Sequence, residues 1–161
     1  MMDIRVDDLR GTDIAALLEE HLDDMYATSP PECVFALDIE KLRDPSITFW
    51  TIWDDDVLAG CIALKALSAT HGEIKSMRTP RTMRNKGAGK ALLAHLLGEA
   101  RSRDLTRISL ETGSQDFFAP ARALYARHGF VVCGPFSGYA LDPHSVFMTL
   151  ELAATNVSAS L

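Results

Sequence analysis

Two segments of the chain place apolar residues at helical spacing, and both predict amphipathic helices. The first begins at about Thr12, which we expect to be the N-cap, and ends at the break Ser29-Pro30-Pro31-Glu32. The second runs from Lys90 to about residue 104, with its leucines on one face. Shorter helices are predicted over residues 38–43 and 117–128, because Asp44-Pro45 and Gly129-Phe130 would end them.

Runs of β-branched and apolar residues between these helices predict strands. The expected strands span residues 3–6, 47–53, 57–66, 71–79, 107–112, 131–133 and 145–152. The acidic turn at residues 54–56 would join two of them in a hairpin. The alternation of strands and helices indicates one α/β domain over residues 1–152, with a mixed, mostly antiparallel sheet flanked by helices. Residues 153–161 are expected to be a disordered tail.

The composition is that of a soluble globular protein, with 47% hydrophobic and 24% charged residues among 161. No apolar run has membrane-spanning length, and the acidic N-terminus does not resemble a signal peptide. The three cysteines lie far apart without C-x-x-C spacing, which favours free thiols in a reducing compartment. We therefore expect a cytoplasmic protein that does not bind membranes.

Charge is distributed unevenly along the chain. Residues 1–60 contain fifteen acidic and four basic side chains, whereas residues 75–107 contain nine basic and two acidic ones. The formal net charge of −6 argues against a nucleic-acid partner. The basic segment suits an anionic ligand, and the acidic remainder could attract a cationic one.

A glycine turn lies inside the basic segment, directly before the main helix. It reads Arg84-Asn85-Lys86-Gly87-Ala88-Gly89-Lys90. Glycines let the backbone approach a ligand, and the unpaired N–H groups and dipole of a helix N-terminus favour negative charge. The segment therefore predicts a site for a phosphate-bearing cofactor.

A second motif lies downstream, where Ala121-Arg122-x-Leu124-Tyr125-x-x-x-Gly129-Phe130 ends a predicted helix. Together with Arg84-x-x-Gly87-x-Gly89, in this order and separation, it resembles the GNAT superfamily of N-acetyltransferases. The agreement covers about residues 3–152. The sequences of residues 71–79 and 110–114 are similar to those of a bacterial subgroup of uncharacterised acetyltransferases with small acceptors.

The resemblance implies that acetyl-coenzyme A is the cofactor, and the spacing of the histidines and cysteines predicts that no metal is bound. The glycine turn, with Arg84, Asn85, Lys86, Gly87, Ala88, Gly89 and Lys90, would hold the pyrophosphate. The strand end Met77-Arg78-Thr79 would pair with the pantetheine arm, and the Met77 N–H would face the thioester oxygen as an oxyanion donor. Many family members carry an asparagine at the position of Phe118 that contacts pantetheine. Gln115 or Ser114 could replace that contact.

Transfer to an amine needs a base for the amine proton and an acid for the departing thiolate. Tyr125 matches the family's tyrosine and is the candidate acid, although it could instead be a core residue of an amphipathic helix. Glu73 is the candidate base, with a surface ion pair as the alternative. Glu111, on the next predicted strand, is its rival for the same role.

The other ionisable residues give weaker signals. The five histidines show no metal-ligand spacing. Cys61 lies within an apolar strand, so we expect it to be a core residue. Glu32 could bind the ammonium group of an acceptor or simply belong to a helix break. Four aromatic residues could line an acceptor pocket or pack against the sheet: Trp50, Trp53, Tyr139 and Phe147.

These features predict an N-acetyltransferase that moves an acetyl group from acetyl-coenzyme A to a primary amine by direct transfer in a ternary complex. The acceptor would be a small molecule or a peptide. The protein could form a homodimer, since dimers are common in the family it resembles. The alternative is a non-catalytic module that binds or senses acyl-coenzyme A.

Overall fold

The computed structural model describes residues 2–31, 39–84 and 86–152. Glu32, Asn85 and the tail from residue 153 lie outside the described residues. The helices and strands are β1 (Met2–Val6), α1 (Thr12–Thr28), α2 (Ile39–Leu42), β2 (Ile47–Asp54), β3 (Val57–Ala66), β4 (His71–Arg78), α3 (Ala88–Ser102), β5 (Arg107–Gly113), α4 (Ala119–Arg127), β6 (Val131–Cys133) and β7 (Ser145–Glu151). Two short 3₁₀ turns, η2 (Arg81–Met83) and η3 (Asp116–Phe118), precede α3 and α4.

All seven strands belong to one sheet, in the order β1-β2-β3-β4-β5-β7-β6. Every neighbouring pair is antiparallel except β4 and β5, which are parallel. The sheet is therefore mixed and mostly antiparallel, as the sequence predicted.

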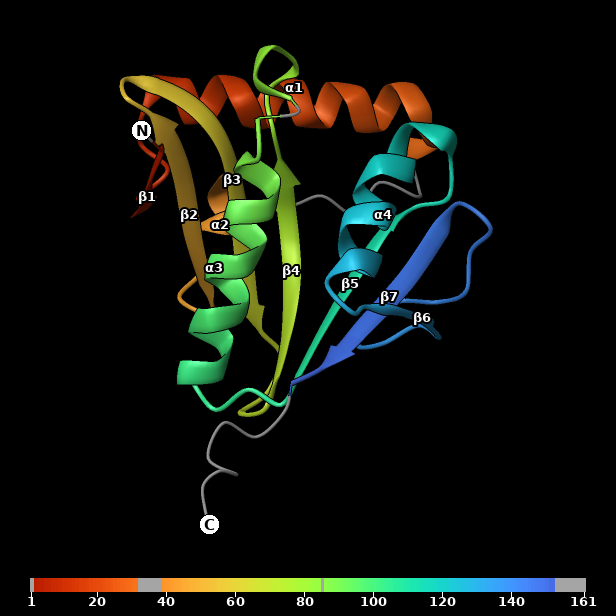
Figure 1. Cartoon of the computed structure of the whole chain (residues 1–161). Helices are drawn as coiled ribbons and strands as arrows, with labels where there is room; N and C mark the ends of the chain where they lie inside the picture. The colour runs from red at the N-terminus through yellow and green to blue at the C-terminus, as the bar shows by residue number, and fades with distance from the viewer. Residues whose placement is uncertain (1, 32–38, 85, 153–161) are drawn as a thin grey trace.

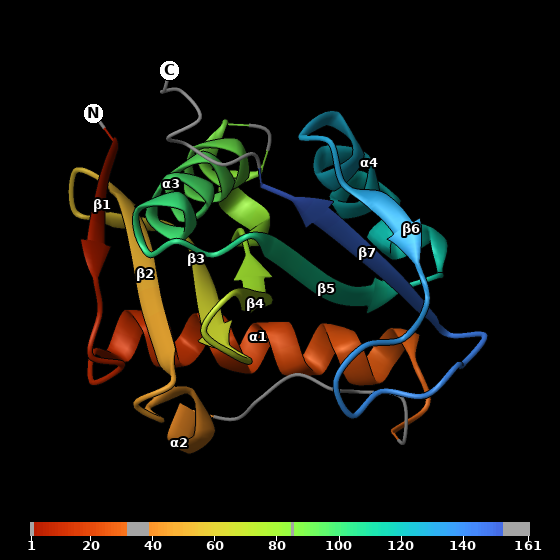
Figure 2. The ribbon, with the colours of Figure 1, turned by 90° about the horizontal axis from the view of Figure 1, so that it is seen from below.

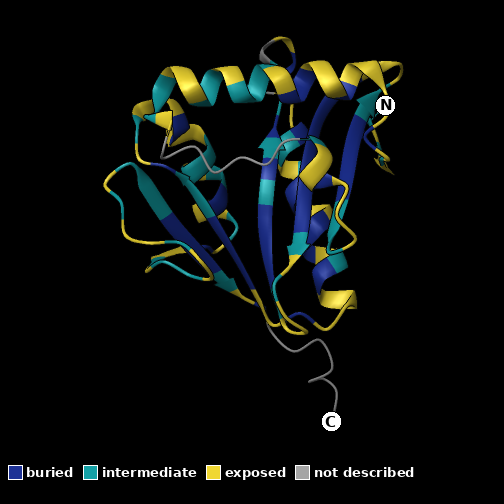
Figure 3. Ribbon diagram, turned by 180° about the vertical axis from the view of Figure 1, so that it is seen from behind, coloured by how far each residue is buried: buried dark blue, intermediate teal, exposed yellow. Residues whose placement is uncertain are grey.

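Helices cover both faces of this sheet. Figure 2 shows α3 and α4 on one face and α1 across the other. The leucine face of α3 is fully buried against the sheet, and its members are Leu92, Leu93, Leu96 and Leu97. The face of α1 with Ile14, Leu17 and Leu18 packs into a second cluster with β2 and β3. Figure 3 shows the consequence, a buried sheet between helices whose outer sides are exposed.

The parallel pair β4–β5 separates partway along its length. Its pairing runs from His71 with Arg107 to Ile74 with Leu110 and stops there. Beyond this point the two strands diverge toward α1, which gives the V-shaped opening in the upper half of Figure 1. Side chains from both diverging halves line one cavity, among them Ser76 and Met77 of β4 and Glu111 and Thr112 of β5.

A β-bulge lies in β4 at the start of this opening. Cys61 pairs with Arg78 and Ala63 with Lys75, so Ser76 and Met77 together face one residue of β3. Ser76 has a φ of 52°, a left-handed conformation that is uncommon for a residue with a side chain. The buried Cys61 thiol donates to the Ser76 carbonyl at 3.2 Å and supports the bulge.

Most predicted elements occur within one or two residues of the expected bounds. Thr12 is the first residue of α1 rather than its N-cap, because Gly11 occupies that position in an extended conformation without a side-chain cap. The helix expected from residue 117 begins as the turn η3 and continues as α4 from Ala119. Cys61 is fully buried, as predicted for a core residue.

Candidate active site

The glycine turn leads into the N-terminus of α3, as the sequence predicted. Gly87 is the N-cap and has a φ of +85°, which only glycine adopts without strain. The first N–H groups of the helix, from Ala88 to Lys90, have no partner within the helix, since intrahelical bonding begins with Ala91 to Gly87 at 3.0 Å. Arg84, Lys86 and Lys90 are exposed around this end. The site therefore suits an anionic group.

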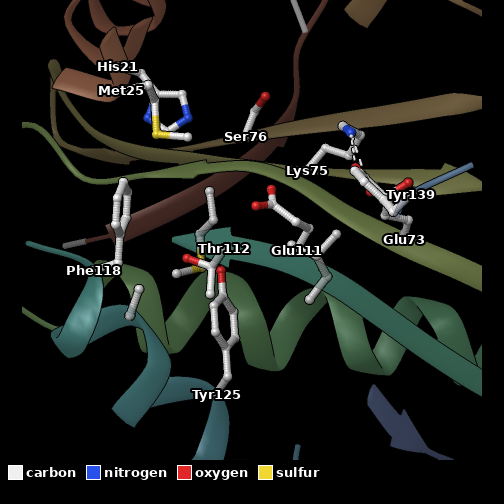
Figure 4. A pocket seen from close by; sticks show the side chains of 13 residues that line it. His21, Met25, Glu73, Lys75, Ser76, Glu111, Thr112, Phe118, Tyr125 and Tyr139 are labelled. Atoms are coloured by element: carbon white, nitrogen blue, oxygen red, sulfur yellow. Dashed lines mark hydrogen bonds and ion pairs between the residues drawn. The ribbon is translucent and has the colours of Figure 1, made fainter. Parts of the chain in front are cut away.

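A cavity of about 90 Å³ lies where β4 and β5 diverge. Side chains from α1, β4, β5 and α4 enter it, together with Tyr139 from the segment between β6 and β7 (Figure 4). Its lining includes His21, Met25, Glu73, Lys75, Ser76, Met77, Glu111, Thr112, Phe118, Tyr125 and Tyr139. The two candidate bases and the candidate acid therefore share one cavity.

Glu73 is buried, with 3% of its surface exposed, and its carboxylate already has partners. The Tyr139 hydroxyl donates to Glu73 Oε2 at 2.6 Å, and Lys75 Nζ lies 3.3 Å from the same oxygen. Lys75 Nζ also donates to the Tyr139 hydroxyl at 2.9 Å. Burial and the adjacent Glu73 carboxylate raise the pKa of Tyr139, so its hydroxyl remains a donor. Figure 4 shows this group at one end of the cavity.

Glu111 projects from β5 into the centre of the cavity (Figure 4). Burial raises the pKa of Glu111 from 4.5 to about 7, and the nearby Glu73 and Asp142 carboxylates add to the increase. The Ser145 hydroxyl and the Lys75 ammonium oppose it. A carboxyl with a pKa near neutral can take up and release a proton at physiological pH.

Tyr125 lies on α4 and is 5% exposed. Its hydroxyl points toward the β4 bulge, where it donates to Met77 Sδ at 3.7 Å. Burial raises the pKa of the Tyr125 phenol well above its usual range, so the hydroxyl stays protonated at neutral pH. The thioether is a weak acceptor, which leaves this hydroxyl free to donate to a better one.

Phe118 is buried in η3 and lines the cavity, where it offers only an apolar ring. Ser114 and Gln115 are the two residues expected to supply the pantetheine contact that an asparagine at this position would make, and they differ in their hydrogen-bond partners. The Ser114 hydroxyl donates to the Pro143 carbonyl at 2.7 Å. Gln115 donates to the Ser29 hydroxyl at 3.2 Å, whereas its buried Oε1 has no partner within the described chain. Gln115 is therefore better placed for an added hydrogen bond.

The Arg78 side chain points away from the glycine turn and toward α1. It is 6% exposed and bonds to the carboxylates of Glu20, at 2.6 Å, and Asp24. Only the backbone of Arg78 is thus available to a ligand between the strands. The ion pairs fix α1 against the end of β4, next to the cavity.

The four aromatic candidates divide into two groups. Tyr139 lines the cavity and packs on Phe147, with ring centroids 5.6 Å apart. Trp50 packs edge-on against His95 of α3, and Trp53 lies 5.2 Å from the Arg5 guanidinium carbon. The two tryptophans are absent from the cavity lining, so they pack the sheet.

Several cavity residues were missed by the sequence analysis, and the polar ones are His21, Lys75, Ser76 and Thr112. His21 and Met25 are four residues apart on α1, which places both on one helix face. That spacing was a usable signal for His21. Nothing in the sequence marks the bulge that brings Ser76 to the cavity.

The described part of the chain brings no three His, Cys, Asp or Glu side chains together in a group that could hold a metal ion. None of its helices combines the length and apolar character needed to cross a membrane.

Comparison with known proteins identifies the family of the fold. The model of the acetyltransferase (GNAT) family matches residues 14–130. The chain belongs to this family. It is 53% identical over 151 residues to YsnE, an uncharacterised N-acetyltransferase of Bacillus subtilis, covering 94% of this chain and all of that one. It is therefore an acetyl-coenzyme A-dependent acyltransferase.

Solved structures of GNAT proteins share the arrangement. A Klebsiella pneumoniae protein described as an acyl-CoA N-acyltransferase is 28% identical, with a TM-score of 0.76 over 95% of this chain and 99% of that one. The PaiA N-acetyltransferase of Thermoplasma acidophilum, solved in complex with coenzyme A, is 17% identical, with a TM-score of 0.73 over 94% and 99% of the two chains. The GNAT fold predicted from the sequence is confirmed.

Proposed function

We propose that this enzyme transfers an acetyl group from acetyl-coenzyme A directly to a primary amine within a ternary complex. The observation that carries the proposal is the shared cavity, which Glu111 and Tyr125 enter from β5 and α4. One is a carboxyl that titrates near neutral pH, and the other is a phenol that stays protonated. A base and an acid thus face the same small space, as amine acetylation requires.

The cofactor would lie along the opening between β4 and β5. Its pyrophosphate would accept hydrogen bonds from the backbone of residues 86–90, with Arg84 and Asn85 in the same turn. Its pantetheine arm would pair with the backbone of Met77, Arg78 and Thr79, next to Gln115 and Phe118. The Met77 N–H, at the bulge, would donate to the thioester oxygen as negative charge develops there.

Replacing Gly89 with aspartate should weaken coenzyme A binding about tenfold or more, or 1.4 kcal/mol. A Cβ at Gly89 would meet Leu124 at 3.5 Å, an ordinary contact, so the fold should tolerate it. The added carboxylate would repel the phosphates. Titration calorimetry with coenzyme A measures the loss, and Gly98→Asp, in open space on the same helix, is the control. Unchanged affinity for coenzyme A in a folded Gly89→Asp variant would show that the pyrophosphate does not bind at this turn.

Glu111 is the stronger candidate for the base, although the sequence favoured Glu73. The Glu73 carboxylate is occupied by Tyr139 and Lys75, and the Lys75 ammonium stabilises its charge. Glu111 has the pKa suited to a base. We assign Glu73 the role of holding the Lys75 and Tyr139 side chains in place next to Glu111.

The proposed reaction needs no other group. The amine nitrogen attacks the thioester carbon, the carbon–sulfur bond breaks, and the amine proton passes to Glu111. The Tyr125 hydroxyl donates its proton to the departing sulfur, so the products are an amide and free coenzyme A thiol. Proton return from Glu111 to Tyr125 through solvent completes the cycle.

The acceptor is proposed to be a small molecule or a peptide amine, and the enzyme to act in the cytoplasm, either alone or as a homodimer. The test is release of coenzyme A thiol from acetyl-coenzyme A with a panel of amines, together with the mass of the product. Amine-dependent thiol release with an acetylated amine is expected. Tight coenzyme A binding without release on any amine would favour the non-catalytic acyl-coenzyme A module instead.

A further inference from the structure

Two residues of the cavity lining each carry a buried polar atom without a hydrogen-bond partner in the described chain. His21 Nδ1 and Ser76 Oγ are both buried, and neither is bonded to any other described residue. A buried polar atom left without a partner costs about 1–3 kcal/mol. Since His21 comes from α1 and Ser76 from the β4 bulge, two independent elements bring this cost to one cavity. Such atoms are typical of a site that completes its hydrogen bonds with a ligand.

His21 is uncharged at neutral pH. Burial lowers the pKa of its imidazole from 6.5 to about 4, and the Arg78 guanidinium contributes to the decrease. Asp24 and Glu20 oppose this effect without overcoming it. The neutral ring has one N–H and one bare nitrogen, so it can donate to or accept from a ligand. The Ser76 hydroxyl has the same versatility.

The charges around the cavity disfavour a negatively charged ligand. Both cations are already engaged, Arg78 with Glu20 and Asp24 and Lys75 with Glu73. These three carboxylates exceed the two cations by one, and ionised Glu111 adds another negative charge. Arg78 keeps an unpartnered Nε, but its guanidinium already pairs with two carboxylates. A carboxylate brought in beside the acceptor amine would therefore meet a net negative charge among the described residues.

The cavity volume limits the group that can bind. About 90 Å³ is several times the roughly 10–15 Å³ that one water molecule needs, so the cavity has room for a few small groups only. The group next to the amine must therefore be small. It must also offer polar atoms to His21 and Ser76.

We propose that His21 and Ser76 select an amine acceptor that carries a neutral oxygen function, a hydroxyl or carboxamide, near its amine, and that the cavity rejects amino carboxylates. The inference rests on the proposed function, since it concerns the acceptor of the same reaction. It makes His21 and Ser76 residues that determine specificity rather than residues that move protons.

Four amines of similar size test the proposal: L-alaninol, L-alaninamide, L-alanine and (as the analogue of alaninol without oxygen) sec-butylamine. After correction for the fraction of unprotonated amine, kcat/KM for alaninol and alaninamide should exceed that for alanine and sec-butylamine at least tenfold. Calorimetry of the coenzyme A-loaded protein with the same amines should give the same order of affinity. Binding is thus measured even where turnover is slow.

Single-residue variants test whether His21 and Ser76 cause this preference among the amines. His21→Leu and Ser76→Ala should each lower kcat/KM for alaninol at least tenfold more than kcat/KM for sec-butylamine. His21→Leu removes an unpartnered polar atom, so its Tm should be equal or higher. His95→Leu, an exposed position on α3, is the matched control and should change neither amine.

Several results would overturn the inference. They are a preference for alanine, no binding of any of the four amines, variants that lower kcat/KM for alaninol and sec-butylamine alike, and variants that weaken the binding of coenzyme A. Equal acetylation of alaninol and sec-butylamine would leave the proposed reaction intact and refute the selectivity. Selective binding without acetylation would refute the proposed reaction and leave the selectivity intact.

Discussion

Replacing Glu111 with glutamine should lower kcat/KM for the amine about 10²–10⁴-fold at pH 7, the usual contribution of a general base. In the wild type this parameter should rise with pH through about 7, as Glu111 loses its proton. The variant should lose that inflection. Its defect should shrink at high pH, where the amine arrives already deprotonated. The measurement is the pH profile of kcat/KM for both proteins.

Folding can be checked in the same variant. Burial raises the pKa of Glu111 in the folded state, so the ionised form opposes folding and stability falls as pH rises through about 7. Glu111→Gln should therefore have an equal or higher Tm at pH 8. Glu73→Gln is the comparison for activity. We expect a smaller loss of kcat/KM than in Glu111→Gln, and the inflection of the pH profile near 7 should remain. A larger loss of kcat/KM in Glu73→Gln, with rescue at high pH, would return the role of base to Glu73.

Replacing Tyr125 with phenylalanine should lower kcat about 10–1000-fold while leaving the Kd for acetyl-coenzyme A nearly unchanged. A thiolate leaves fairly readily without help, so the loss should fall at or below the usual range for an acid. The variant removes one hydroxyl whose protein partner is the weak acceptor Met77 Sδ, so the fold should persist. Single-turnover rates and cofactor titration separate the two effects.

The Tyr125→Phe defect should not shrink at high pH, in contrast to that of Glu111→Gln. The control is Tyr26→Phe on the exposed part of α1, which should be fully active. Full activity in Tyr125→Phe would reduce Tyr125 to a packing residue of α4, which was the sequence alternative.

The fold was predictable because local signals agreed with the final packing. The leucines of α3 mark its buried face in the sequence, and they are buried in the structure. Gly87 marks the turn before α3 because its conformation, with a φ of +85°, strongly favours glycine. The error at Thr12 arose because a capping side chain is a preference, and here Gly11 takes the position without one.

The site was predictable only in part, because burial depends on long-range packing. Glu73 and Glu111 look equivalent in the sequence, one on each central strand. They differ because burial raises the pKa of Glu111, whereas Glu73 has Lys75 and Tyr139 as partners. Tyr139 lies 66 residues beyond Glu73 and reaches it from another segment. The unpartnered Ser76 hydroxyl depends on a bulge defined by the register between β3 and β4. No local pattern encodes that register.

Initial-rate kinetics with both substrates varied test the central claim, direct transfer between two bound substrates, most directly. Double-reciprocal plots at several fixed amine concentrations should give lines that intersect, because both substrates must be bound before any product leaves. The intact protein, incubated with acetyl-coenzyme A alone, should keep its unmodified mass. Parallel lines together with an acetylated protein would contradict the account, since the acetyl group would then pass through a residue of the enzyme.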